Sequence, residues 1–349
     1  MERAANMEPI GWPSPVLTGK GHARSRIFAG TLVGSACLSA LLASWVPLQF
    51  SIVAVFLFAG PHNWFEFRYF LMRLPARFGR SRNFFLVAFA GIGFLTLTSL
   101  SLPGLYYTQL WSGNNWIAVI GVWNTLLLLW IATLVWLRGK QSRSRKWTRV
   151  GTAAWPVVFA LSSLNWLAPE IFSLAIVYLH PLVALWFLDR HLRRTRPEWL
   201  ATYHRFLALL PLLIGAICWQ LARTPHLADD NGLAWRITQH AGAELLTSIS
   251  SHLLVSLHVF LEMLHYGVWL VALPLIGASG PIWDVKTIPL FGHPRGFPRS
   301  IVALLVLGLF LIALLWLGFA VDYSVTRDVY FAVAIAHVLA EVPFLLRTI

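Results

Sequence analysis

The sequence contains few charged residues and few cysteines. Asp, Glu, Lys and Arg make up only 12% of the 349 residues, whereas 58% are hydrophobic and the mean hydropathy is +0.67. A chain with so little polar surface cannot cover a soluble globule. The two cysteines, Cys37 and Cys218, lie inside apolar segments without the spacing of a disulfide framework or a thiolate metal site, so we interpret them as buried small residues.

Long apolar runs recur along almost the whole chain. About 18 or more consecutive apolar residues suffice to cross the hydrocarbon core, and there each backbone amide must bond within its own helix. The sequence therefore predicts an all-α, polytopic integral membrane bundle of about ten transmembrane helices. Charge, proline and glycine bound these helices near residues 27–46, 48–72, 84–107, 115–137, 150–167, 170–189, 206–223, 244–277, 300–320 and 329–347.

The basic residues predict the orientation of the bundle. With the N-terminus in the cytoplasm, all of the 27 Lys and Arg except Arg223, Arg236 and Arg327 fall on the cytoplasmic side, as the positive-inside rule requires. Both ends are then cytoplasmic, with an N-terminal segment 1–26 and a single transmembrane domain 27–349. The net charge of +13 serves orientation, so we expect a lipid bilayer, and no nucleic acid, as the partner. We expect the bacterial inner (cytoplasmic) membrane.

Histidines are placed inside the predicted helices. An ionisable side chain at membrane depth costs about 2.5–3.5 kcal/mol when charged, so it needs a partner or a function. The even-numbered helices, which all run from outside to inside, carry the five candidates His62, His180, His258, His265 and His337. Counting residues from the outer end puts four of them near the middle of the bilayer, which predicts that side chains from four helices meet at one level.

Three of these histidines have an acid four residues later. The spacing H-x-x-x-E occurs as His62 with Glu66, His258 with Glu262, and His337 with Glu341. Residues i and i+4 share one face of a helix, where the carboxylate can bind a metal or accept the N–H of a metal-bound imidazole. His265 follows His258 by seven residues, or about two helical turns, and therefore lies on the same face of the helix.

Three interpretations of this cluster stay open at this point. The first is a metal site, with the five histidines as candidate ligands and the three glutamates orienting them or bridging two ions. Imidazole and carboxylate without thiolate suit non-haem iron first, then zinc, copper or manganese, and haem held by two histidines is a further option. The second is proton or ion translocation, for which a break at Gly60 and Pro61 would be suitable. The third is structural polar packing between helices.

Four short motifs resemble a known family, the Brp/Blh-type membrane carotene dioxygenases. Gly60 to Glu66, with the sequence GPHNWFE, is similar to that family's Pro-His motif with an acid four residues on. The other motifs are Tyr178-Leu179-His180, His258 with His265, and Ala336-His337 through Glu341. The resemblance implies iron held by histidines and cleavage of a carotenoid. The paired histidines are seven apart here and four apart in the family.

The sequence as a whole predicts a membrane-embedded, metal-dependent oxygenase or related oxidoreductase that acts on an apolar lipid or isoprenoid. The alternative is a proton- or ion-coupled transporter that uses the same His and Glu side chains. The sequence assigns no catalytic residue beyond the candidate ligands.

Overall fold

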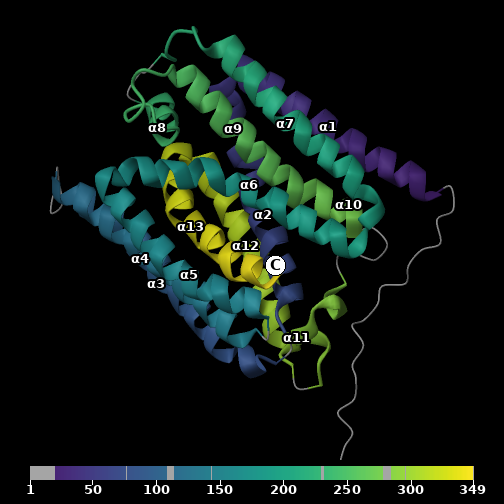
Figure 1. Cartoon of the computed structure of the whole chain (residues 1–349). Coiled ribbons are helices and arrows are strands. Elements are labelled where there is room, and N and C mark those ends of the chain that lie inside the picture. Colours follow the sequence, from purple (N-terminus) through teal and green to yellow (C-terminus); the bar gives the residue numbers. More distant parts are fainter. Residues whose placement is uncertain are drawn as a thin grey trace, which may run out of the picture.

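The computed structural model of the chain describes residues 20–75, 77–107, 114–142, 144–228, 232–277, 284–294 and 296–348. Within these ranges there is no β-strand, and long helices pack side by side (Figure 1). The predicted all-α polytopic bundle is confirmed. Residues 1–19 of the predicted N-terminal segment lie outside the described residues, and the first helix already begins at Lys20.

The long helices follow the predicted apolar runs closely. They are α1 (Lys20–Trp45), α2 (Pro47–Arg73), α3 (Arg82–Tyr107), α4 (Asn114–Gln141), α5 (Arg145–Leu167), α6 (Pro169–Thr195), α7 (Leu200–Leu221), α9 (Ser251–Gly267), α12 (Pro298–Val321) and α13 (Tyr323–Thr348). Three short helices, α8 (Leu233–His240), α10 (Leu273–Gly277) and α11 (Pro289–Gly292), lie between them.

Within the described part of the chain, nine helical segments are long and apolar enough to cross a membrane. The chain is therefore an integral membrane protein. These nine match nine of the ten predicted spans, and the tenth is α2, which is 27 residues long but is not among them. Polar side chains, including His62, Asn63 and Glu66, lower the hydropathy of α2, and two of these three belong to the predicted site.

The predicted helix 244–277 is divided in the structure. It begins only at Ser251, where the Ser250 hydroxyl caps α9 by accepting the backbone N–H of His252 at 3.2 Å, and residues 244–250 are not helical. A π-helical turn, Val268–Ala272, separates α9 from α10 and lies directly after the stripe that carries His265. Such turns are frequent at functional sites in helices.

The helices form two outer groups around a central one. Figure 1 shows α1, α7 and α9 as neighbours and α3, α4 and α5 as another group, with α2, α6, α12 and α13 between them. In the apolar stretch of α9 and α10, 67% of the residues are buried, against 11% in α12. Helix α9 is thus the inner member of its group, where it packs against α2 and α6, whereas α12 has exposed apolar side chains that are suited to contact lipid.

The two cysteines are not both buried as expected. Cys37 is exposed and Cys218 is only partly buried, and both are free thiols. In a bilayer an outward-facing position can carry an apolar thiol without contact with water, so hydropathy alone did not distinguish a lipid-facing from a buried position.

Polar side chains that join helices outside the predicted site are paired with one another. Asn124 donates to the side-chain oxygen of Asn165 at 2.8 Å and to the Pro169 carbonyl at 3.0 Å, which links α4, α5 and α6. Indole N–H groups also bridge helices, as Trp130 does to the Val87 carbonyl at 3.0 Å and Trp316 to the Phe56 carbonyl at 2.8 Å. The bundle thus satisfies these groups, as a hydrocarbon environment requires.

The contact between α3 and α4 depends on a missing side chain at Gly91. A Cβ atom there would collide with the Trp130 indole, which would lose its bond to Val87. Gly91→Ala should therefore destabilise the protein by about 1–3 kcal/mol and lower its Tm in detergent. Gly93→Ala is the matched control, since nothing lies within 4 Å of its added Cβ. Equal Tm values for the two variants would contradict this packing.

Candidate metal site

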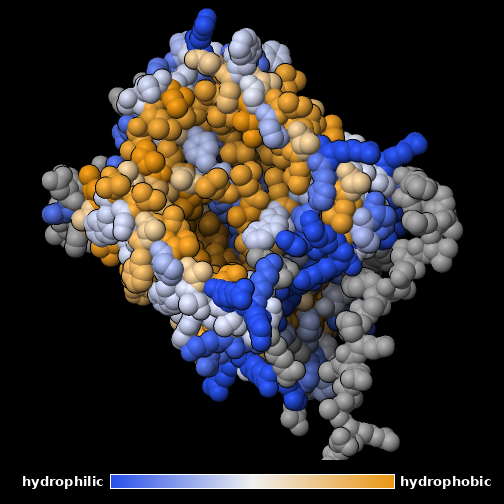
Figure 2. All heavy atoms as spheres, in the orientation of Figure 1, coloured by the Kyte–Doolittle hydropathy of each residue, from blue (hydrophilic) through white to orange (hydrophobic). Residues whose placement is uncertain are grey.

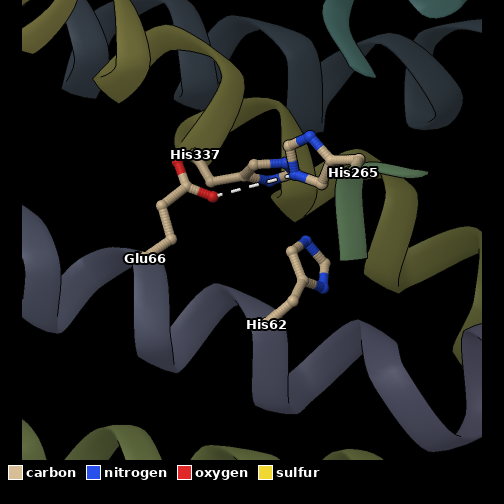
Figure 3. A group of neighbouring side chains, drawn as sticks. All are labelled: His62, Glu66, His265 and His337. Carbon is tan, nitrogen blue, oxygen red and sulfur yellow. Dashed lines mark ion pairs between the residues drawn. The ribbon is translucent and has the colours of Figure 1, made fainter. Parts of the chain in front are cut away.

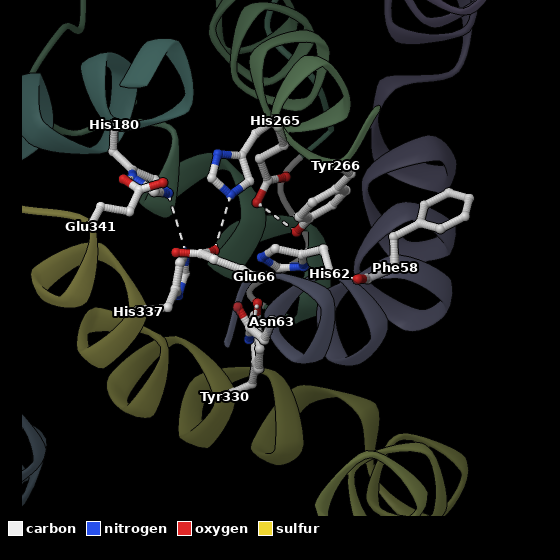
Figure 4. Close-up of polar contacts among 11 residues, drawn as sticks. Phe58, His62, Asn63, Glu66, His180, His265, Tyr266, Tyr330, His337 and Glu341 are labelled. Atoms are coloured by element: carbon white, nitrogen blue, oxygen red, sulfur yellow. Dashed lines mark hydrogen bonds and ion pairs between the residues drawn. The ribbon is translucent and has the colours of Figure 1, made fainter. Parts of the chain in front are cut away.

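Four of the five predicted histidines meet in the centre of the bundle together with two glutamates. His62 and Glu66 come from α2, His180 from α6, His265 from α9, and His337 and Glu341 from α13. Figure 3 shows His62, Glu66, His265 and His337 pointing toward one another, and Figure 4 adds His180 and Glu341 beside them. The site therefore draws on four helices, no two of which are consecutive in the sequence.

The ligand atoms lie at distances that suit a metal ion. Two groups, His62 with Glu66, His265 and His337, and His180 with His265 and Glu341, each offer atoms within 4.8 Å of one another. His265 belongs to both. Two ligands on opposite sides of one ion are about 4.2 Å apart when each bond is about 2.1 Å, so small inward movements would complete coordination.

The backbone fixes the tautomer of His62. Its Nδ1 lies 2.9 Å from the Phe58 carbonyl oxygen, and a carbonyl can only accept, so the neutral imidazole carries its proton on Nδ1. The lone pair is then on Nε2, which is buried and has no hydrogen-bond partner among the described residues. An imidazole held in this way presents a ligand atom to the site.

His180 is oriented by Glu341 from another helix. Its Nδ1 donates to Oε2 of Glu341 at 3.0 Å, which directs Nε2 toward the site. That Nε2 faces Nε2 of His337 at 3.2 Å. Two nitrogen ligands of one ion, each about 2.1 Å from it, are about 3.0–3.4 Å apart when they are at a right or tetrahedral angle, which matches this distance.

The site concentrates buried polar atoms that have no hydrogen-bond partner, which elsewhere in the described structure are scattered, as at Thr96, Ser162 and Trp269. Both carboxylate oxygens of Glu66, both ring nitrogens of His265, Nδ1 of His337 and Oε1 of Glu341 have no hydrogen bond within the described structure. The ion pair between His265 Nε2 and Glu66 Oε2 is 4.0 Å long, beyond hydrogen-bonding distance. Among the described residues, the ion pairs of these two carboxylates are with histidines, His265 for Glu66 and His180 for Glu341. A divalent cation would balance the two carboxylates and pair with these atoms.

His258 and Glu262 lie outside this cluster, although both are on α9. His258 Nδ1 is 3.7 Å from Glu262 Oε2, and its ring packs edge-on against His240 of α8 with the centroids 5.0 Å apart. Neither residue belongs to a group of potential ligands within the described structure. Burial lowers the pKa of His240, and His258 and Arg327 lower it further, so His240 is neutral near pH 7.

A cavity of about 140 Å³ joins the two sets of polar residues. His62, His180, His265 and His337 line one part of it, and His240, His258 and Glu262 line another. Apolar side chains of α6 and α13 form its walls: Ile176, Val177, Phe331, Ala334, Ile335 and Val338. Figure 2 shows that the molecular face over these helices is largely hydrophobic and is hollowed there.

The H-x-x-x-E spacing does not predict which histidine each glutamate contacts in the structure. His258 stays with Glu262, but Glu66 is nearest His265, and Glu341 pairs with His180, which has no acid of its own four residues on. Tertiary packing thus exchanges two of the three acids between helices. His252, also on α9, serves the fold, because its Nε2 bonds the Ser44 carbonyl oxygen at 3.1 Å.

Sequence reasoning missed the residues around the cavity. Tyr266 stacks at 4.4 Å on the His62 ring, and Tyr330 accepts a hydrogen bond of 3.4 Å from the Asn63 amide. Both tyrosines line the cavity. Tyr330 precedes His337 by seven residues and therefore lies on the same face of its helix, which is a signal that the sequence contained.

No protein-family model, no curated protein and no solved structure matches the sequence. The resemblance to the carotene dioxygenases therefore stays a prediction that depends on the four short motifs.

A buried carboxyl group without hydrogen bonds destabilises a protein that binds no ion at that place. In protein stripped of metal with a chelator, Glu66→Met should raise the free energy of unfolding by about 1–3 kcal/mol, because it removes this unpaired group from the core. The measurement is the Tm of both chains in the same detergent. The control Glu198→Met changes an exposed acid and should shift stability by less than about 0.5 kcal/mol. A lower Tm for the Glu66 variant would show that Glu66 has a stabilising partner.

Proposed function

We propose that this chain is a membrane-embedded, metal-dependent oxygenase or related oxidoreductase that acts on an apolar lipid or isoprenoid. The observation that carries the proposal is the meeting of four histidines and two glutamates from four helices, with most of their inward atoms unpaired at the centre of an apolar bundle. Unpaired buried polar groups are retained where a function needs them.

Iron is the metal that we propose. The donors are imidazole nitrogens and carboxylate oxygens without thiolate, a set that suits non-haem iron and also accommodates zinc, copper or manganese. His62, His180, His265 and His337 would hold the ion with Glu66, and Glu341 would orient His180. When bound with an open coordination position, iron would supply the activation of dioxygen that the reaction needs.

The cavity supports an apolar substrate that enters from the bilayer. Its walls on α6 and α13 are apolar, and the hollowed hydrophobic face of Figure 2 lies over these helices. A volume of about 140 Å³ is close to that of a cavity that binds a benzene-sized group, so only one end of a long molecule fits inside. The protein would orient that end beside the histidines and exclude water from it. Carotenoid cleavage, which the four motifs imply, is one reaction of this class.

A transporter is the second candidate, and the fold favours it less. Helix α2 continues through Gly60 and Pro61 without a break, so the discontinuous helix that would suit ion binding is absent from that position. Substrate-dependent proton flux in proteoliposomes, from protein that contains no metal, would replace our proposal with this one. We propose the bacterial inner membrane as the location.

Metal analysis tests the proposal. Protein purified in detergent should contain close to stoichiometric iron or another transition metal, and the double variant His62→Ala/His337→Ala should lose it. His258→Phe is the matched control, because this histidine lies outside the ligand groups and its variant should retain the metal. Metal that persists in the double variant, or none in the native protein, would contradict the site.

The contact between His180 and Glu341 gives a graded test. Glu341→Gln removes the carboxylate that orients His180 at 3.0 Å and should weaken metal affinity about 10–100-fold without unfolding the protein. A chelator competition titration measures the change, with Glu198→Gln at an exposed position as the control. An unchanged affinity would mean that Glu341 does not orient a ligand.

A further inference from the structure

The cavity has a second polar end that the proposed metal chemistry does not use. His240 of α8 and His258 and Glu262 of α9 line it there, together with Tyr266 and Tyr330. These side chains come from three helices and line the same cavity as the histidine cluster and the apolar walls of α6 and α13. An apolar substrate alone would leave Glu262 Oε2 without a hydrogen-bond partner, at a cost in free energy.

Glu262 has an acceptor that the protein leaves free. Its side chain is buried, and Oε2 makes no hydrogen bond within the described structure, because His258 Nδ1 is 3.7 Å away. The other oxygen, Oε1, accepts a long hydrogen bond of 3.5 Å from the Tyr266 hydroxyl. Oε2 is therefore able to accept a hydrogen bond from a group that enters the cavity.

The surroundings of Glu262 favour a neutral partner. The imidazoles of His258 and His240 can each donate or accept one hydrogen bond. Buried Arg327, whose guanidinium carbon is 4.6 Å from the centroid of the Phe331 ring, supplies positive charge near this end. Glu262 interacts electrostatically with that cation, so a ligand carboxylate would compete with the Glu262 carboxyl group for it, whereas a hydroxyl could donate to Oε2 and accept from an imidazole.

We propose that this end of the cavity binds a hydroxyl group, and that the substrate is a long apolar molecule with an alcohol at the end that enters first. The inference rests on the part of the proposed function that treats the cavity as a site for an apolar substrate. It adds the substrate class and gives His258 and Glu262 the role of recognising the hydroxyl.

The position of this subsite limits where the reaction takes place. Glu262 and His258 precede His265 by three and seven residues on one helix, which is about 4.5 Å and about 10.5 Å along its axis. A molecule with its hydroxyl at Glu262 therefore has carbons near the head of the chain beside the histidine cluster, while the rest of the chain extends between α6 and α13.

Equilibrium binding of two matched probes tests the inference. Tritiated geranylgeraniol and its methyl ether have the same apolar chain, but only the alcohol can donate a hydrogen bond. Native protein in detergent should bind the alcohol about tenfold more tightly than the ether. Glu262→Leu and His258→Phe should each reduce this ratio to about one. Met263→Leu, a volume-conserving change next to Glu262 at a residue that does not line this cavity, should leave the ratio unchanged.

The outcomes separate this inference from the proposed function when metal content is measured on the same samples. Equal binding of the two probes by native protein, a ratio that persists in both variants, or no saturable binding of either probe would overturn the hydroxyl subsite. Metal-free native protein that still prefers the alcohol would support the subsite and reject the metal-dependent function.

Discussion

The rule that a polar group in hydrocarbon needs a partner organises this molecule. Outside the centre of the bundle, Asn124 and Asn165 follow it between helices, as do the N–H groups of Trp130 and Trp316 with backbone carbonyls. In the centre, His62, Glu66 and His265 depart from it. Unpaired polar atoms gathered from several helices at one place are costly in hydrocarbon, and this cost is the basis of the proposed metal site.

The polar side chains of the site also explain why α2 is less apolar and α9 more buried than the other long helices. Helix α2 is less apolar than its neighbours because it provides His62 and Glu66, and it depends on burial among other helices. Helix α9, the most buried of the long apolar segments described, carries His258, Glu262 and His265 in less than two turns. Packing thus buries the ionisable side chains of α2 and α9 away from lipid, while α12 exposes apolar side chains.

The cavity in the centre of the protein has two chemically different ends. One end presents nitrogen and carboxylate ligands, and the other presents His240, His258 and Glu262, which belong to no ligand group. Apolar walls from α6 and α13 connect them. An arrangement of this kind can hold one end of an amphipathic molecule by its polar group while its adjacent carbons lie at the ligand end.

The sequence by itself determined the fold class, nearly all helix positions and the group of histidines, because hydropathy and the cost of buried charge act locally along the chain. It also indicated that side chains from four helices would meet at one depth, since residue counts along helices convert to depth. Which histidines meet was decided only by the tertiary structure. His258 and His265 share one face of α9 but lie about 10.5 Å apart along its axis, so the depth at which α9 packs against its neighbours placed His265 in the cluster and His258 beside His240. Packing between α6 and α13 paired Glu341 with His180 across helices. A local pattern such as H-x-x-x-E fixes the face that two side chains share, but not the helix that this face meets.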